Sequence, residues 1–196
     1  YIVDWHNALV GHMQHNVRDP NRDKTHGRIW RVTYPARPLA TPPRIAGESI
    51  VNLLEVLKDP IIRTRHHARM ELRLYPKKEV VKALGAWVGR LDANDPDYEH
   101  HLLEALWVHQ HHHSVNRGLL EKILNAKDPR ARAAATRVIS FWRDGLRRPL
   151  DLLHPRIGDS HPRVRAEALR AVSYVDSKAA ASLALDVLDH PMDDYL

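Results

Sequence analysis

The sequence predicts a mainly α fold, an α-solenoid of antiparallel helix pairs preceded by a short β segment. The first supporting observation is a repeated Asp/His-Pro opening, which recurs at intervals of 36, 33, 33 and 29 residues at Asp59-Pro60, Asp95-Pro96, Asp128-Pro129, His161-Pro162 and His190-Pro191. The second is that residues 128–139 and 161–172 are near copies, in which small apolar residues recur at helical spacing beside arginines. Similar segments at a fixed separation are typical of stacked helical arrays.

Stripes of apolar residues indicate where the helices lie. The i, i+3, i+4, i+7 spacing of one helix face is first seen in Ile50, Leu53, Leu54 and Leu57. The second helix is expected to carry Pro60 in its first turn, a position that tolerates a missing N–H. Comparable stripes predict helices over about residues 50–57, 60–75, 80–91, 96–107, 119–124, 129–144, 150–157, 162–175 and 180–188.

Stacking is the expected packing of these helices. Each helix pair has too little apolar area to be stable alone, so it must pack on its neighbours. The alanines of the two near copies allow adjacent helices to approach closely, and the arginines between them are expected to reach solvent with their stems along the surface. The alternative is a compact helical bundle whose openings are similar by coincidence.

Residues 1–34 differ in character from the rest. β-branched and aromatic residues are concentrated in residues 1–5 and 27–34, and the second of these segments alternates with a period of two. Both segments therefore read as strands. Because two strands cannot form a stable domain alone, we expect them to be the edge of a larger sheet.

A proline-rich linker is expected to join this β segment to the helices. Four prolines lie within residues 35–47 and predict a semi-rigid, extended segment. The predicted organisation is a β segment over 1–34, the linker over 35–47 and the solenoid over 48–196. The sequence begins within an apolar run and stops just after the fifth opening, so we expect a piece of a longer protein with a truncated solenoid.

The composition excludes several kinds of site. There is no cysteine, which excludes disulfides, thiolate metal sites, a cysteine nucleophile and covalently attached c-type haem from this sequence. No run of about 18 apolar residues is present, so no membrane span is expected. The net charge of +6 permits an anionic partner, although a solvated basic surface is the commoner explanation. The helical part also carries no glycine-rich phosphate loop and no Gly-x-Ser-x-Gly motif, and we expect no enzyme site there.

The segment 6–26 gathers residues suited to chemistry. Together with the strand that follows, it holds the candidate site residues His12, Asp19, Arg22, Asp23, His26 and Arg28. Carboxylates and imidazoles supply the lone pairs and protons that metal coordination and acid–base catalysis need. Asp19 and Asp23 could bind calcium, although they fall short of the roughly six to eight oxygen ligands it takes. The alternative is structural, because Asp19-Pro20-Asn21 is ordinary turn chemistry and the other side chains would then join the loop to the sheet edge.

A run of histidines after residue 108 contains a weak metal candidate. His109 and His113 are four residues apart, so on a continuing helix they would share a face and could chelate one ion. No acidic ligand stands at matching spacing, although Glu104 is near. The run also falls where the helix is expected to end, and protonated histidines there interact favourably with the helix dipole. A structural role or adventitious binding therefore outweighs a dedicated metal site.

The arginines between residues 130 and 170 could line a concave basic face that binds nucleic acid. Such binding would depend strongly on salt. Acidic residues interleave with these arginines, and no aromatic stacking platform accompanies them in the sequence. Nucleic-acid binding is therefore disfavoured, given the interleaved Asp144, Asp151, Asp159 and Glu167.

The pattern Asp/His-Pro-x-x-Arg-x-x-Ala-x-x-Ala/Val resembles the second helix of HEAT repeats, and residues 161–172 match it best. The resemblance covers residues 48–196. It implies a HEAT-type α-solenoid that serves as a structural or protein-interaction scaffold, and it says almost nothing about activity.

The N-terminal residues resemble a second family through more particular motifs. These are Asp4-Trp5-His6-Asn7, Gly11-His12, Arg18-Asp19-Pro20, Arg22-Asp23 and His26-Gly27-Arg28-Ile29-Trp30-Arg31. Together they look like the closing segment of a large β-propeller in the membrane-bound dehydrogenase-like proteins of planctomycetes, which are similar to sorbosone and glucose dehydrogenases. In that family the propeller ends with a Gly-Arg-Ile-aromatic-Arg strand and continues through a short linker into HEAT repeats. Residues 103–110 and 189–194 also resemble the repeats of that family.

This second resemblance implies an exported, periplasmic redox protein in which the repeats stand beside a propeller blade. It implies haem c on a downstream domain, and PQQ with calcium on the propeller, all outside this sequence. The propeller would be an intramolecular partner of the solenoid. Segment 6–26 would then contribute to a site that oxidises a sugar or an alcohol.

Overall fold

A computed structural model describes residues 1–4, 20, 25–36, 38–39 and 41–191 of the chain. The chain divides into two compact units, Tyr1–Pro42 and Pro43–Leu196. The division lies within the proline-rich segment 35–47, where proline removes backbone donors and favours extended backbone over packed structure.

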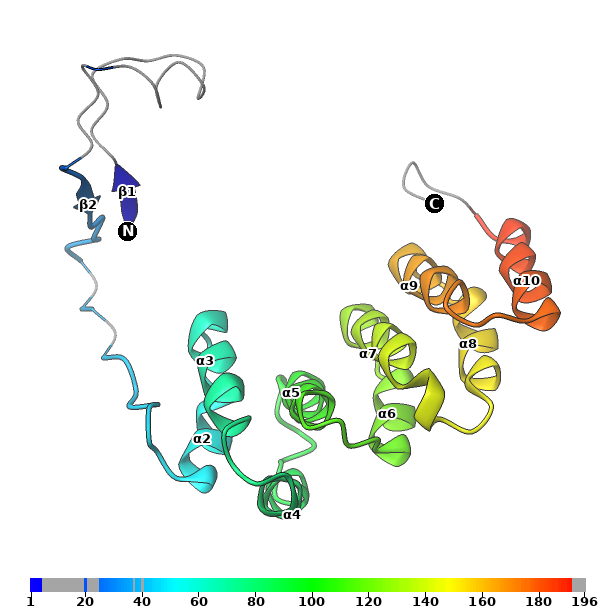
Figure 1. Cartoon of the computed structure of the whole chain (residues 1–196), viewed down its shortest axis with the longest axis horizontal. Helices are drawn as coiled ribbons and strands as arrows, with labels where there is room; N and C mark the ends of the chain where they lie inside the picture. The colour runs from blue at the N-terminus through cyan, green and yellow to red at the C-terminus, as the bar shows by residue number, and fades with distance from the viewer. Residues whose placement is uncertain (5–19, 21–24, 37, 40, 192–196) are drawn as a thin grey trace. The chain divides into compact units, whose positions relative to one another are not determined.

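The first unit contains a two-stranded antiparallel ribbon, drawn in blue in Figure 1. Strand β1 (Ile2–Asp4) pairs with β2 (Arg28–Trp30), so that Val3 lies opposite Ile29 and Ile2 lies opposite Trp30. Val3 and Ile29 are 77% and 71% exposed, and Ile2 and Trp30 are also exposed. Because successive side chains point to opposite faces of a strand, neither face of the ribbon is covered by the residues that the structure describes.

The second unit is helical, and helix forms within each segment that the apolar stripes predict. The helices are α2 (Ile50–Val56), α3 (Ile62–Leu72), α4 (Lys77–Val88), α5 (Tyr98–His111), α6 (Arg117–Leu124), α7 (Pro129–Trp142), α8 (Pro149–Ile157), α9 (Pro162–Val172) and α10 (Lys178–Leu185). Short 3-10 helices follow α7 at Arg143–Gly145 and α10 at Asp186–Asp189. The prediction of a mainly α fold with a short preceding β segment is confirmed.

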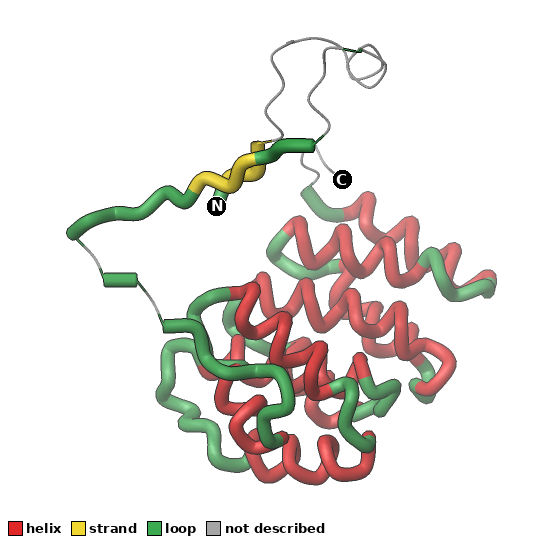
Figure 2. The backbone as a smooth tube through the Cα atoms, turned by 60° about the vertical axis from the view of Figure 1, so that its left-hand side comes forward, coloured by secondary structure: helices red, strands yellow, loops and turns green. Residues whose placement is uncertain are grey.

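The helices of this unit lie in two layers (Figures 1 and 2). The inner row consists of α3, α5, α7 and α9, and each of these helices contacts the next. The outer row consists of α2, α4, α6, α8 and α10, and its first four helices each contact the inner-row helix that follows in the chain. Helix pairs stacked in this way form the expected solenoid rather than a closed bundle.

The apolar core runs continuously between the two rows. The outer row contributes Leu53, Leu84, Leu120 and Leu153, and each of these side chains is fully buried. Burying one leucine side chain stabilises by about 1.5–3 kcal/mol, which is too little for a single helix pair to offset its loss of conformational entropy. Helices α7 and α9 are in contact, and each carries small buried residues, Ala131 and Ala135 on α7 and Ala168 and Ala171 on α9, of the kind that permits close approach.

The Asp/His-Pro openings lead into their helices in two different ways. The expectation that Pro60 lies in the first turn of its helix was wrong. Pro129 and Pro162 occupy the first turns of their helices, as expected. Pro60 and Pro96 instead precede the residues that cap α3 and α5. The inner-row helices consequently begin at 62, 98, 129 and 162, at intervals of 36, 31 and 33 residues. The difference arises because an aspartate can accept a hydrogen bond either as a helix cap or in a turn before the helix.

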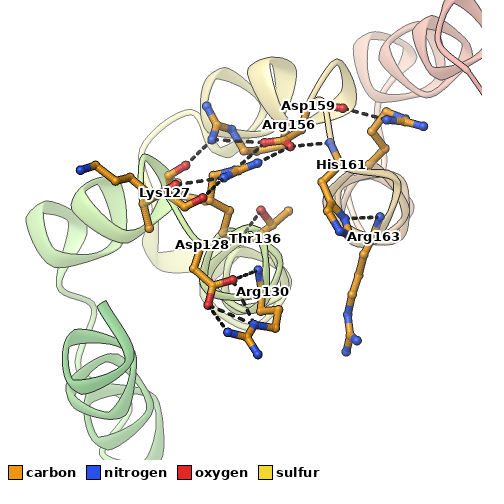
Figure 3. A network of polar contacts seen from close by, with 12 residues as sticks. Lys127, Asp128, Arg130, Thr136, Arg156, Asp159, His161 and Arg163 are labelled. Atoms are coloured by element: carbon orange, nitrogen blue, oxygen red, sulfur yellow. Dashed lines mark hydrogen bonds and ion pairs between the residues drawn. The ribbon is translucent and has the colours of Figure 1, made fainter. Parts of the chain in front are cut away.

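Some arginines that were expected at the surface are buried links between helix pairs. Arg132 of α7 donates two hydrogen bonds of 2.8 Å to the carboxylate of Asp159, in the turn before α9 (Figure 3). Arg165 of α9 is only 4% exposed, and it donates to the backbone oxygens of Asp159, at 2.9 Å, and Pro191. These guanidinium groups lie inside the stack, where the carboxylate and carbonyl oxygens replace water.

The same backbone link recurs along the inner row. The guanidinium of Arg65 donates to the carbonyl of Asp59 at 2.7 Å, and Arg132 donates to the carbonyl of Ala126 at 3.0 Å. Arg165 and Asp159 form the equivalent pair, so each arginine reaches the carbonyl six residues before it. The repeated arginine therefore ties each of these helices to the turn that precedes it.

Candidate binding groove

The exposed side of the inner row is hollowed into an open groove of about 950 Å³. Residues of α3, α5, α7 and α9 line it, together with the turns that lead into the first three of these helices. The groove is formed entirely within the second unit. Its lining residues come from successive repeats, so a ligand that fills it would contact several helices at once.

An apolar strip lies on the α5 and α7 walls of the groove. Ala134, Val138 and Phe141 follow one another at helical spacing on α7, and Leu103 and Trp107 are four residues apart on α5. Phe141 is 57% exposed, although it is a large apolar side chain, and Trp107 is half-buried. The groove is therefore lined by two aromatic rings, one from α7 and one from α5.

A buried ion-pair cluster supports the α5 wall. The side chain of Glu104 is 1% exposed and forms ion pairs with Arg65, at 2.8 Å, and with Arg69 of α3. The His100 Nε2 atom lies 3.4 Å from the same carboxylate. The Arg69 guanidinium also lies 5.1 Å from the centre of the Trp107 ring, as a cation–π contact. These contacts hold α3 against α5 and fix the ring of Trp107.

The electrostatics of this cluster favour the charged carboxylate. Burial raises the pKa of the Glu104 carboxyl, but His100 and the two guanidinium groups lower it by more, so the pKa lies below its ordinary value. Glu104 is therefore ionised at neutral pH. A metal role for Glu104 beside the histidine run is not supported by this geometry, because Arg65 and Arg69 occupy its oxygens.

The carboxylates around the groove mostly have structural partners. Glu99 accepts hydrogen bonds from the backbone N–H groups of Lys127, at 2.7 Å, and Asp128, at 2.8 Å. Asp128 caps α7 and binds the guanidinium of Arg130 with both oxygens. Asp59 accepts from a backbone N–H in the turn before α3. The full set of lining carboxylates is Asp59, Asp97, Glu99, Asp128 and Glu167.

Two lining arginines retain free hydrogen-bonding capacity. Arg137 of α7 is half-exposed, and its guanidinium lies 3.9 Å from Glu167, which is too long for a hydrogen bond. Arg163 of α9 is exposed, and its guanidinium has no partner within the part of the chain that the structure describes. In Figure 3 the Arg163 side chain extends away from the polar network, whereas Arg130 is held by Asp128. The groove therefore offers two guanidinium groups to a ligand.

The predicted loop site lies largely outside the described residues. This applies to His12, Asp19, Arg22 and Asp23. Of the other two candidates, the His26 Nδ1 atom lies 3.1 Å from the hydroxyl of Thr25, and the Arg28 guanidinium lies 5.5 Å from the centre of the Trp30 ring. No cluster of three or more metal-ligating side chains occurs among the residues that the structure describes.

The histidine run does not form the pair that a metal site would need. Helix α5 ends at His111, and His113 lies beyond it with a φ of 48°, so His109 and His113 do not share a face of a continuing helix. The His109 Nε2 atom lies 3.0 Å from the amide nitrogen of Asn116, whose oxygen caps α6. Burial lowers the pKa of both His109 and the neighbouring His112, whose Nε2 atom lies 3.1 Å from the carbonyl oxygen of Leu72. These histidines join helices rather than present a ligand set.

Sequence reasoning missed the aromatic residues of the groove. The expectation that no aromatic platform accompanies the arginines was wrong, because Phe141 lies one turn beyond Arg137 on α7 and Trp107 reaches the same groove from α5. The helical spacing of Ala134, Val138 and Phe141 carried a signal, since it places a phenylalanine on a face with arginine. Trp107 had no local signal, because its proximity depends on the packing of α5 against α7.

Comparison with known proteins identifies the repeats of the C-terminal part. Residues 116–196 match the family model for HEAT repeats, which covers α6 to α10 and the residues that follow. A search of curated proteins and a search of solved structures each found no match to the chain. None of the described helices is long and apolar enough to cross a membrane. The matched segment is thus similar to HEAT repeats, and α2 to α5 continue the same two-row arrangement before it.

Proposed function

We propose that the helical unit is a scaffold that binds a partner protein in the inner-row groove. The observation that carries this proposal is the exposed Phe141, which lines a groove across successive repeats together with Trp107, Arg137 and Arg163. Large aromatic side chains and arginines are the residues that most often dominate the energy of protein interfaces. HEAT repeats also present extended surfaces of this kind through their stacking.

Nucleic-acid binding is the less supported use of the same groove. Its free arginines and aromatic rings would suit a nucleic acid, but five carboxylates line the groove with them. These carboxylates would repel successive phosphates of a bound strand. A protein partner requires no such uniform charge.

Site-specific photo-crosslinking tests the scaffold proposal. A photoreactive phenylalanine analogue replaces Phe141 in cells of the source organism, and the same analogue replaces the exposed Ala86 on the outer-row helix α4 as a matched control. The expected result is a discrete protein crosslinked at position 141 and absent at position 86, which mass spectrometry then identifies. Equal crosslinking at both positions, or none at position 141, would contradict the proposal.

We further propose that the ribbon of residues 1–34 completes a sheet of an exported, dehydrogenase-like protein. The observation that favours this second proposal is the exposure of apolar side chains on both faces of the ribbon, Ile2, Val3, Ile29 and Trp30. A two-stranded ribbon of this kind is stable only when further strands or a packed layer cover it. In this proposal segment 6–26 contributes to sugar or alcohol oxidation, with PQQ, calcium and haem c held by other domains.

An assay of dye-linked oxidation tests this second proposal. The expected result is that replacement of His12, Asp23 and His26 by alanine in the full-length protein abolishes oxidation while the circular dichroism spectrum is retained. Unchanged turnover in the triple variant would remove the catalytic role of the segment.

A further inference from the structure

We infer that the groove is selective for an acidic, partly apolar peptide segment. In this complex a carboxylate of the segment pairs with Arg137 or Arg163, and an apolar side chain lies against Phe141 and Trp107. The inference rests on the scaffold function proposed above, because it assigns the chemistry of the partner that the groove binds.

Two aromatic rings give the groove its affinity for an apolar side chain. Phe141 is 57% exposed at the C-terminal end of the α7 wall, and Val138 and Leu103 line the same groove. The ring of Trp107 is already fixed by the Arg69 guanidinium at 5.1 Å, so a ligand would not have to order it. A pre-ordered aromatic surface binds an apolar side chain with a small loss of conformational entropy.

The charged groups of the groove differ in whether they already have partners within the chain. Glu99 and Asp128 accept hydrogen bonds from the backbone and from Arg130 within the chain. Arg163 has no partner among the described residues, and Arg137 has only a long contact of 3.9 Å with Glu167. An incoming carboxylate therefore gains a guanidinium partner without displacing one.

The side chains of a basic peptide segment would mostly meet carboxylates that already have partners within the chain. A lysine entering the groove would have to compete with Arg130 for Asp128, or with two backbone N–H groups for Glu99. Glu167 and Asp97 are the exceptions. One Glu167 oxygen is buried without a hydrogen bond, but its side chain is only 16% exposed and lies beside Arg137. Asp97 is exposed and makes no side-chain capping hydrogen bond, but it precedes Trp107 by ten residues, or about 15 Å of helix. The paired groups thus favour an acidic ligand although the formal charges of the groove nearly balance.

Fluorescence anisotropy with defined probes tests the inference on the whole chain. The first probe is a labelled peptide of about 12 residues, which spans roughly 40 Å when extended and contains Glu, Leu, Phe and Gly. In the second probe each Glu is replaced by Lys, and in the third each Leu and Phe is replaced by Ser. The fourth is a labelled single-stranded oligonucleotide of the same number of units.

The acidic apolar probe is expected to bind most tightly of the four. The exchanges Arg137→Glu, Arg163→Glu and Phe141→Ala are each expected to weaken its binding about tenfold. Arg90→Glu is the matched control, because Arg90 is exposed and does not line the groove, and its effect is expected to stay within about twofold. All substituted residues are exposed, and circular dichroism verifies that each variant is folded.

Several results would overturn the inference. They are absence of binding by the acidic apolar probe, equal or tighter binding of the lysine probe, and insensitivity of the acidic probe to all three groove variants. Tighter binding of the oligonucleotide, lost in Arg137→Glu, would assign the groove to nucleic acid instead. These results concern partner chemistry only, whereas failure of the scaffold proposal would appear separately as the absence of a crosslink at position 141.

Discussion

At the residue scale, the most constrained group of the helical unit is the Glu104 carboxylate. It is buried between Arg65 and Arg69, which come from a helix more than thirty residues earlier. A carboxylate in such a place is stable only because two guanidinium groups and an imidazole replace the water that it loses. Its removal leaves those positive charges close together without a counter-charge.

Glu104→Ala is therefore expected to lower the free energy of unfolding by about 3–5 kcal/mol. Urea unfolding followed by circular dichroism measures this loss. The matched control is Glu121→Ala, which removes an exposed i, i+4 pair with Arg117 and is expected to cost about 0.3–0.5 kcal/mol. Similar losses in the two variants would show that the buried cluster does not stabilise the contact between α3 and α5.

The buried histidines lead to a second prediction at this scale, which concerns how the stability of the folded chain depends on pH. Burial lowers the pKa of four of them in the folded state: His101, His109, His111 and His112. Below the ordinary histidine value of about 6.5 the unfolded chain therefore binds more protons than the folded chain. Stability is expected to be retained above that value and to fall as the pH drops through it.

Urea midpoints at pH values about one unit above and one unit below 6.5 measure this effect. The midpoint is expected to be lower at the acidic value, while Glu104 stays ionised because its pKa lies below its ordinary range. His112→Asn is expected to reduce the difference between the two midpoints. A midpoint that is unchanged, or higher at the acidic value, would contradict the burial of these imidazoles.

The sequence could not predict these residue environments. Glu104 was noted in the sequence only as an acidic residue near the histidine run, and its partners in the structure are the arginines of α3. Arg132 follows the same alternation as exposed arginines, and its side chain is nevertheless only 14% exposed beside Asp159. Local periodicity reports which face of a helix a residue occupies, and the neighbour packed on that face is a tertiary property.

At the element scale, the helices were predictable and their ends were less so. Apolar stripes locate the helices because a half-buried helix must repeat its apolar residues at helical spacing. The starts of α3 and α5 were displaced by two residues, since Asp59-Pro60 and Asp95-Pro96 form turns and Asp128-Pro129 forms a cap. The same two residue types satisfy backbone donors in either way.

The end of α5 provides a prediction at this scale. His113 has a φ of 48°, a conformation in which glycine is favoured and β-branched residues are strained. His113→Gly is expected to be neutral or stabilising by up to about 1 kcal/mol, and His113→Val to destabilise by about 1 kcal/mol or more. Urea unfolding of the two variants measures the difference.

If α5 continued through His113, the order of stability of the two variants would be reversed. Glycine in the interior of a helix costs about 1 kcal/mol relative to alanine, and valine costs less. If His113→Gly proves less stable than His113→Val, the helix extends past His111 and the pairing of His109 with His113 must be reconsidered.

At the scale of the whole molecule, the repeat array follows from the sequence but the groove does not. The regular openings predict stacked helix pairs, and the match of residues 116–196 to HEAT repeats agrees with this. The groove depends on how α5, α7 and α9 are placed against one another, which no single repeat determines. That Phe141 and Trp107 line the same groove was for this reason visible only in the structure.

The division into two units predicts that the helical unit is stable by itself. Removal of residues 1–42 is expected to leave the midpoint of thermal unfolding of the helices nearly unchanged, because the division falls at Pro42 and the core lies between the two helix rows. Circular dichroism of residues 43–196 beside the whole chain measures this. A loss of cooperative unfolding in the shorter chain would show that the helices depend on the N-terminal unit.

The central claim is that a protein partner occupies the inner-row groove, and calorimetric titration of the crosslinked partner tests it most directly. Phe141 and Val51 are 57% and 56% exposed, but Val51 belongs to the outer-row helix α2 and does not line the groove. The account predicts that Phe141→Ala weakens binding of the partner about tenfold or more, while Val51→Ala changes it by less than about twofold. Equal affinity of the Phe141→Ala variant and the unmodified chain would contradict it.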